Sequence, residues 1–332
     1  MNRTAAAATA RRGRRLGLLA TAGATFALVV AACGGTAATP TPIPPSDAYT
    51  VVSKAVGAPM DRVKVNLGLT TSGGDTPVTI DPKQIEVVAD TKNGKGTFHL
   101  SLPKSALGTN ANALPLAGDT IDVDVLFDGS AVYVKSPLAA TLLPLLMAQS
   151  GQQVPGDLSG WIKLGTAEEL GGLLGGLAGV PDASEAPSAS GLGDLTPEQL
   201  KQALEEAGVT VTYVGTEARN GVDTDHMTIT IDPTKLAGSD VAKELPGGQL
   251  GQIQQLAGEG TASGDLWFDR ATGRISEADI NLADKNGETA KVTILVSDPG
   301  DVSFDAPAGA TEVPIGPLLQ TLMQTFGGLQ TP

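Results

Sequence analysis

Apolar and polar residues alternate along several stretches of the chain. Val123 and Val125 alternate with Asp122 and Asp124, so the apolar side chains fall on one side of an extended strand. The same alternation recurs over residues 63–69, 227–231 and 292–296. Because successive side chains of a strand point to opposite faces, the pattern indicates strands with one buried face and one face in water.

Short turns connect these alternating stretches. Each turn holds an Asn-Gly or Asp-Gly pair, which tolerates the positive φ angles that a two-residue hairpin requires. The pairs are Asn93-Gly94, Asp128-Gly129, Asn220-Gly221 and Asn286-Gly287. The sequence therefore predicts an antiparallel sheet of about ten strands, divided around a central helical region.

The central region carries helical patterns. Residues 138–147 are apolar on all sides and contain Pro144. Thr166 and Glu169 form a capping box that would open a helix rich in leucine and glycine. Because each glycine in a helix interior costs about 1 kcal/mol, two interpretations stay open: a poorly ordered, partly buried helix, or an apolar flap that moves. A better specified capping box begins at Thr196.

The first residues read as a targeting segment. Four arginines within residues 11–15 precede an uncharged, largely apolar stretch over residues 16–32. This stretch ends in small residues directly before Cys33, an ending that resembles the lipobox of bacterial lipoproteins. We expect cleavage after Ala32 and acylation of Cys33. A plain signal peptide and an uncleaved anchor are the alternatives.

The predicted organisation has three parts. Residues 1–32 are a lipoprotein signal peptide, and residues 33–48 are the lipidated cysteine and a Pro/Thr-rich tether. Residues 49–332 are a single domain, with an internal flexible loop at 181–193. Acyl chains on Cys33 would hold the protein on the cell membrane, facing the extracytoplasmic side.

Composition narrows the function. The 332 residues include 22 Lys and Arg against 36 Asp and Glu, a net charge of −14. Removal of residues 1–32, which contain five arginines and no acid, leaves 17 bases against 36 acids, or −19. Such an acidic body argues against a nucleic-acid partner. One Cys permits no internal disulfide and no Cys-based metal site, and two His permit no three-His metal site.

Catalytic motifs are missing from the sequence. It holds no Gly-x-Ser-x-Gly elbow and no phosphate-binding loop. We expect no catalytic residue, no metal site, no cofactor and no enzymatic activity. His99 and His226 lie in alternating stretches and are expected on the solvated face. Trp161 and Trp267 are expected in the core or at its rim.

Several short motifs follow one another in an order that resembles a known family. The motifs lie at residues 127–135, 161–164, 214–221, 264–269 and 272–275. With the lipobox, their order is similar to that of the LppX/LprAFG lipoproteins of actinobacteria and, more loosely, of the LolA-like lipoprotein carriers. The resemblance covers the pattern from residue 50 to residue 310. The Gly-rich leucine segment and the loop at 181–193 depart from it.

The resemblance implies an α+β fold, in which a curved antiparallel half-barrel of about ten strands is wrapped on several apolar helices and holds an apolar cavity for acyl chains. It implies a non-catalytic lipoprotein that binds or transfers a lipid or another acyl-bearing ligand, with other envelope transport proteins as partners. The alternative is an envelope scaffold or sensor that binds a protein partner on the same fold. The residues expected to line the cavity are Val63, Val65, Leu67, Ile121, Val123, Val125, Leu142, Leu146, Leu170, Leu173, Leu174, Leu177 and Ile229.

Aromatic residues make up only 3% of the chain, so its interior is aliphatic. An aliphatic composition suits a smooth cavity and a dense core equally. The residues alone therefore leave open whether the sheet and the helices enclose a cavity or close completely.

Overall fold

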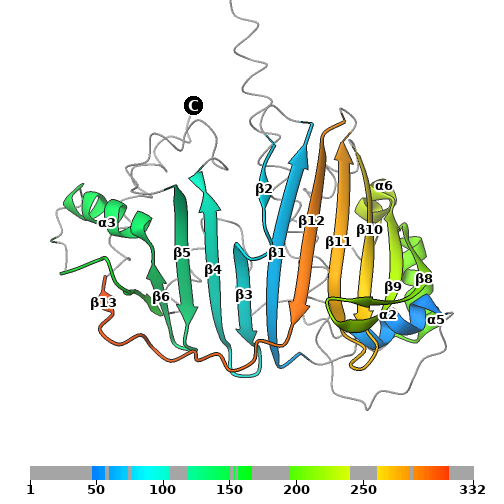
Figure 1. The fold of residues 1–332 in the computed structure, drawn as a ribbon, viewed down its shortest axis with the longest axis horizontal. Coiled ribbons are helices and arrows are strands. Elements are labelled where there is room, and N and C mark those ends of the chain that lie inside the picture. The colour runs from blue at the N-terminus through cyan, green and yellow to red at the C-terminus, as the bar shows by residue number, and fades with distance from the viewer. Residues whose placement is uncertain are drawn as a thin grey trace, which may run out of the picture. The chain divides into compact units, whose positions relative to one another are not determined.

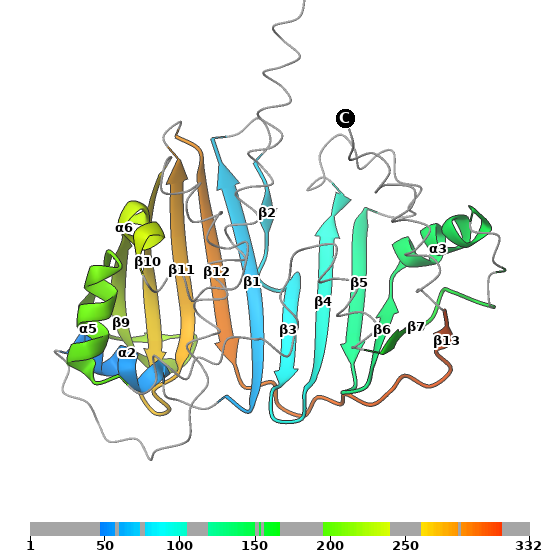
Figure 2. The same cartoon turned by 180° about the vertical axis from the view of Figure 1, so that it is seen from behind.

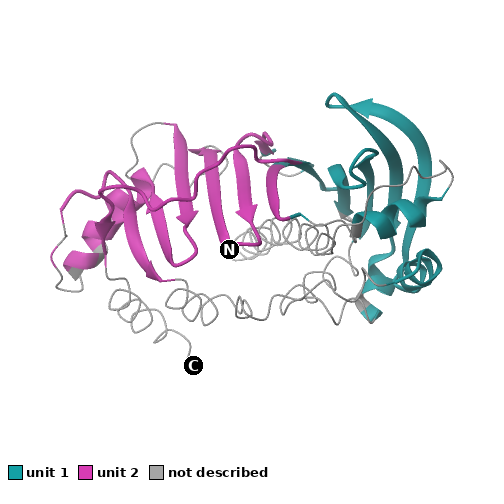
Figure 3. Cartoon of the chain, turned by 90° about the horizontal axis from the view of Figure 1, so that it is seen from below, with its two compact units in different colours: residues 1–60, 68–78, 184–296 teal, residues 61–67, 79–183, 297–332 magenta. Residues whose placement is uncertain are grey.

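The computed structural model describes residues 47–56, 60–73, 77–104, 119–149, 153, 156–166, 195–239, 260–284 and 287–313. Contacts divide the chain into two compact units, coloured separately in Figure 3. Unit 1 comprises residues 1–60, 68–78 and 184–296. Unit 2 comprises residues 61–67, 79–183 and 297–332.

Several predicted features lie outside the described residues. They are the signal peptide, Cys33, most of the tether, the leucines of residues 170–177 and the loop at 181–193. Thr166, the expected cap of the leucine-rich helix, is the last residue of a strand, and the residues that follow it are not described.

Unit 2 is built on a mainly antiparallel sheet. Its strands are β1 (Arg62–Ser72), β2 (Thr79–Ile80), β3 (Ile85–Asp90), β4 (Lys95–Pro103), β5 (Thr120–Phe127), β6 (Ala131–Lys135), β7 (Ile162–Thr166) and β13 (Thr311–Glu312). They are hydrogen-bonded in the order β13-β7-β6-β5-β4-β3-β1, and β2 pairs with β1 (Figure 1). The pairs from β1 to β7 are antiparallel, and β13 runs parallel to β7. Strand β1 begins in unit 2 and ends in unit 1.

The apolar helix expected over residues 138–147 forms in unit 2. It is α3 (Pro137–Gln149), and it contains Pro144. Met147 of this helix joins Leu158, Ile162 and Val313 in one buried cluster. Ile162 is fully buried and belongs to β7.

Unit 1 carries the other long strands. They are β8 (Val209–Arg219), β9 (Val222–Ile231), β10 (Gly260–Asp269), β11 (Ile275–Asp284) and β12 (Thr289–Ser297). The order is β1-β12-β11-β10-β9-β8, and the pairs from β12 to β8 are antiparallel. Met227, Ile280 and Ile294 lie on one face of this sheet and are almost fully buried.

Three helices belong to unit 1: α2 (Ala48–Val56), α5 (Pro197–Glu206) and α6 (Pro233–Gly238). In Figure 2, α2 and α5 lie together at one end of unit 1, and both helices pack against β8. The expected capping box opens α5, where the Thr196 side chain accepts from the Gln199 backbone and the Gln199 side chain accepts from the Thr196 backbone. Leu200 of α5 is 1% exposed and anchors the helix to the unit.

The β8–β9 turn has the geometry that its sequence predicts. Asn220 has φ of 51° and Gly221 has φ of 81°, both positive as a tight hairpin turn requires. Asn-Gly is favoured there because asparagine and glycine adopt this conformation at low cost. The register then continues along β8 and β9 from the pair Arg219 and Val222.

The predicted fold class is confirmed as an open, mainly antiparallel sheet with few helices. Thirteen strands are described where about ten were expected. The excess comes partly from β2 and β13, which have two residues each and are too short to show alternation. Among the described helices, none combines the length and the apolarity needed to cross a bilayer.

Candidate functional site

One face of the unit 2 sheet is apolar across five strands. Val65 pairs with Val87, Val87 with Phe98, Phe98 with Val125, and Val125 with Val134. Paired residues share a face, so these side chains form a continuous cross-strand row. Two shorter rows, Ile85-Leu100-Val123 and Leu102-Ile121, lie on the same face. We call this set the apolar face of unit 2.

This face is only partly buried. Strand β4 is flanked by strands on both sides, yet all nine of its residues, Phe98 and Leu100 among them, are of intermediate exposure. Val87, Val123 and Val125 are half-buried as well. By contrast Val88, on the opposite face of β3, is 2% exposed. An apolar surface left partly in water in the middle of a sheet is the feature that an apolar ligand would cover.

The structure brings together several of the residues predicted to line a cavity. Val63, Val65, Leu67, Ile121, Val123 and Val125 alternate along β1 and β5 so that they lie on the apolar face of unit 2. Leu142 is half-buried on α3, and nothing is described of the Leu146 side chain. Leu170, Leu173, Leu174 and Leu177 lie outside the described residues. Ile229 is buried in the core of unit 1.

The opposite face of the unit 2 sheet carries the charged groups. Lys64 pairs with Glu86 at 2.5 Å, and His99 Nδ1 lies 2.7 Å from Asp124 Oδ1. Ser101 donates to Asp122 at 2.6 Å. His99 therefore lies on the polar face, as expected, and these polar groups are kept away from the apolar rows.

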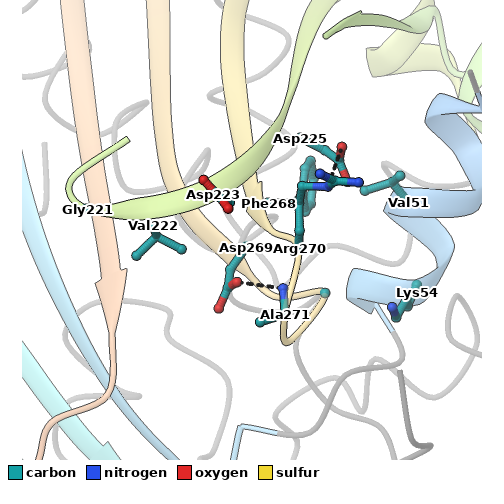
Figure 4. A pocket seen from close by; sticks show the side chains of 11 residues that line it. Val51, Lys54, Gly221, Val222, Asp223, Asp225, Phe268, Asp269, Arg270 and Ala271 are labelled. Carbon is teal, nitrogen blue, oxygen red and sulfur yellow. Dashed lines mark hydrogen bonds and ion pairs between the residues drawn. The ribbon is translucent and has the colours of Figure 1, made fainter. Parts of the chain in front are cut away.

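A pocket of about 650 Å³ lies in unit 1, where β9 begins and β10 ends. Figure 4 shows Val51 and Lys54 of α2 on one side and the residues that follow Gly221 and Phe268 on the other. Its wall carries both signs of charge: Lys54 and Arg270 against three aspartates. A volume of this size is in the range that small-molecule sites occupy.

Asp225 is the buried carboxylate of this pocket. Its side chain is 10% exposed, and its Oδ1 accepts a hydrogen bond from the Tyr213 hydroxyl at 3.2 Å. Arg270 Nε lies 3.5 Å from the same oxygen. Burial, together with the Asp225 carboxylate, raises the pKa of Tyr213, so the phenol stays protonated and keeps donating.

The other two aspartates of the pocket differ in their roles. Asp269 shapes the turn after β10, because its carboxylate accepts from the Ala271 backbone and the Thr272 hydroxyl, both at 2.8 Å. Asp223 is exposed, and its backbone carbonyl accepts from the Arg270 N–H at 3.0 Å. Asp223 thus fixes the backbone of Arg270 and leaves its own carboxylate toward solvent.

Sequence reasoning missed this pocket, although one signal was present. Asp225, Met227, Ile229 and Ile231 share one parity along β9, so alternation places an acidic side chain in line with three apolar ones. A carboxylate on the apolar side of a strand needs a partner. Its partners, Tyr213 and Arg270, come from other strands and turns and could not be read from local pattern.

A correction concerns His226. It lies on the polar face as expected, but its side chain is only 18% exposed rather than solvated. Nε2 lies 2.9 Å from Asp265, and the ring stacks on Trp267, which is itself buried. Within the described ranges, no group of three or more His, Cys, Asp or Glu side chains could hold a metal ion.

No protein-family model matches the sequence, and no curated protein matches it either. Among solved structures, it is similar to LprF from Mycobacterium bovis, with 14% identity, a TM-score of 0.37 and coverage of 79% of this chain and 94% of that chain. It is similar to the Mycobacterium tuberculosis lipoprotein LppX, with 15% identity, a TM-score of 0.35 and coverage of 77% and 97%. It is also similar to MucB in its complex with MucA, with 11% identity, a TM-score of 0.27 and coverage of 81% of this chain and 62% of the MucB chain.

Proposed function

We propose that this protein is a non-catalytic envelope lipoprotein that binds an acyl-bearing ligand on the apolar face of unit 2. In this proposal Cys33 carries the acyl chains that anchor the protein on the extracytoplasmic side of the cell membrane. Bound ligand passes to or from other envelope components. No cofactor takes part.

The observation that carries the proposal is the half-burial of the apolar rows on β3, β4 and β5. Covering apolar surface gains about 25 cal/mol per Å² removed from water. The row from Val65 to Val134 contains no polar side chain, so an acyl chain laid along it would meet only carbon. A ligand with chains of this kind is therefore favoured over a polar one.

Helix α3 supports the same interpretation. Its thirteen residues include no charged side chain. Met147 points into the buried cluster with Ile162, whereas Leu145 is 55% exposed. The helix thus offers apolar side chains beyond those that its own packing uses.

The test compares two substitutions on neighbouring residues of β4. Phe98→Lys places a charge on the apolar face of unit 2, and His99→Lys places the same charge on the opposite face, where the His99 side chain is 44% exposed beside Asp124. The full chain in detergent is titrated with a fluorescent long-chain fatty acid. We expect the wild type and His99→Lys to bind it, and Phe98→Lys to bind about tenfold more weakly or not at all.

Thermal unfolding of both variants separates a loss of binding from a loss of fold. A folded Phe98→Lys variant that binds the fatty acid as tightly as the wild type contradicts the proposal. So does a wild-type protein that binds none and releases no lipid on organic extraction.

A further inference from the structure

The pocket of unit 1 is independent of the apolar face of unit 2 and has a chemistry of its own. We propose that it binds a small zwitterionic group, an ammonium and a phosphate a few bonds apart. The ammonium would donate to Asp225 and Asp223, and the phosphate would lie against Arg270 and Lys54. This binding does not depend on the proposed acyl ligand.

The first step of the argument is the second oxygen of Asp225. Oδ1 is occupied by the Tyr213 hydroxyl and by Arg270 Nε. Oδ2 accepts no hydrogen bond from any described residue. Over those same residues, the one fully occluded side-chain polar atom that lacks a partner is Arg62 Nε. Oδ2 is therefore not fully occluded, and Asp225 lines the pocket.

Asp225 Oδ2 is open to a donor that enters the pocket. A carboxylate accepts at both oxygens, so this one can take a further hydrogen bond. An N–H donor with a positive charge satisfies the oxygen and the charge together. Asp223, two residues away on the same strand end and facing the same pocket, supplies a second negative charge.

The second step is the pair of cations on the pocket wall. Arg270 uses Nε toward Asp225 and is 43% exposed, so the rest of its guanidinium fork can meet an anion. Lys54 approaches from α2, its aliphatic chain lying over Gly273. A ligand with a cation alone would be repelled by Arg270 and Lys54, and one with an anion alone by Asp223 and Asp225. A zwitterion meets both requirements.

The experiment titrates the full chain in a non-ionic detergent with O-phosphoethanolamine by isothermal titration calorimetry. Three probes each lack one feature: ethanolamine lacks the anion, inorganic phosphate lacks the cation, and phosphocholine lacks the N–H donors. We expect each to bind about tenfold more weakly than O-phosphoethanolamine.

Native mass spectrometry with a lysophosphatidylethanolamine distinguishes a lipid headgroup from a free zwitterion. Binding of both forms, or of the lipid form alone, supports the proposal and names the source. Failure of both forms to bind overturns it.

The matched variants are Asp225→Asn, Asp223→Asn and Arg270→Gln, with Glu205→Gln on the exposed side of α5 as the control. Asp225→Asn keeps an oxygen for the Tyr213 hydroxyl, and Asp223 is exposed, so both variants are expected to fold. We expect about tenfold weaker binding of O-phosphoethanolamine for the three pocket variants and no change for the control. Pocket variants that are folded and bind as the wild type does overturn the proposal.

Discussion

The imidazole ring of His226 lies stacked on the indole ring of Trp267, with 4.8 Å between the ring centroids and 14° between the ring planes. Arg219 also lies over the indole, 4.4 Å from its centroid. The indole N–H donates a hydrogen bond to the Glu217 carboxylate. Arg219 makes a bidentate hydrogen bond to Glu277, which is 4% exposed. Trp267 is therefore the centre of a polar network on the unit 1 sheet, and cation–π and stacking contacts add to its burial.

Trp267→Phe tests how much this network contributes. The substitution keeps an aromatic ring but removes the N–H donor and part of the stacked surface. We expect a loss of about 1–2 kcal/mol in the free energy of unfolding, measured by urea denaturation followed by circular dichroism. Trp161→Phe is the matched control, because Trp161 is only half-buried against Leu126 and Tyr133. A loss in the control as large as that in Trp267→Phe would refute a special role for the network.

Asp128 gives the protein a defined sensitivity to acid. Burial alone would raise the pKa of Asp128, but its carboxylate accepts from the Ala131 and Ser130 backbone and from the Ser130 and Tyr133 hydroxyls. These bonds outweigh burial and lower the pKa from 3.8 to about 2. Because the folded-state pKa is depressed, the stabilisation is fully present above pH 3.8 and is lost as the pH falls toward 2.

Asp128→Asn tests this linkage. The difference in unfolding free energy between the wild type and the variant should be constant above pH 4 and should shrink between about pH 4 and pH 2. Urea denaturation at a series of pH values measures it. A difference that stays the same down to pH 2 would show that the Asp128 carboxylate is not held ionised by this turn.

The local parts of this fold could be read from the sequence, because their causes are local. Asn220-Gly221 sets its own turn, and Thr196 with Gln199 sets the start of α5. Alternation along β5 correctly separated Val123 and Val125 from Asp122 and Asp124. Each of these depends on residues a few positions apart.

The features that the sequence did not predict depend on residues that are far apart in the sequence. The face of His226 followed from alternation, but its low exposure comes from Trp267 and Asp265 on β10. The parallel pairing of β13 with β7 joins residues about 150 positions apart and has no local signal. The pocket around Asp225 likewise depends on Tyr213 and Arg270, which only the strand register brings to it.

Gly264 marks a close approach inside the unit 1 sheet. It pairs with Ile229 on one side and Ile280 on the other. A Cβ at this position would lie 2.4 Å from the Asp279 carbonyl oxygen and 2.9 Å from Ile280 Cδ1. The carbonyl belongs to a hydrogen-bonded strand and cannot move away cheaply, so glycine is required for the strands to keep their spacing.

Gly264→Ala is accordingly expected to reduce the free energy of unfolding by about 1–3 kcal/mol, as other overpacked sites do. Gly160→Ala is the control, since a Cβ there meets nothing within 4 Å, and its effect should stay within about 0.5 kcal/mol. Chemical denaturation of the two variants gives the comparison. Equal stability of Gly264→Ala and the wild type would mean that β10 and β11 lie farther apart than described.

Cys33→Ala tests the anchor that the sequence predicts. Cys33 is the only cysteine of the chain, so its removal eliminates every possible thioether-linked lipid. Two or more acyl chains hold a protein stably on a bilayer, whereas the acidic body, at −19 after cleavage, would not be attracted to anionic headgroups. We expect the wild type in the membrane fraction after a high-salt wash, and the variant either released or retained with its signal peptide uncut. Mass spectrometry of the mature N-terminus separates these two results, and a cleaved variant that stays on the membrane like the wild type would contradict lipidation as the anchor.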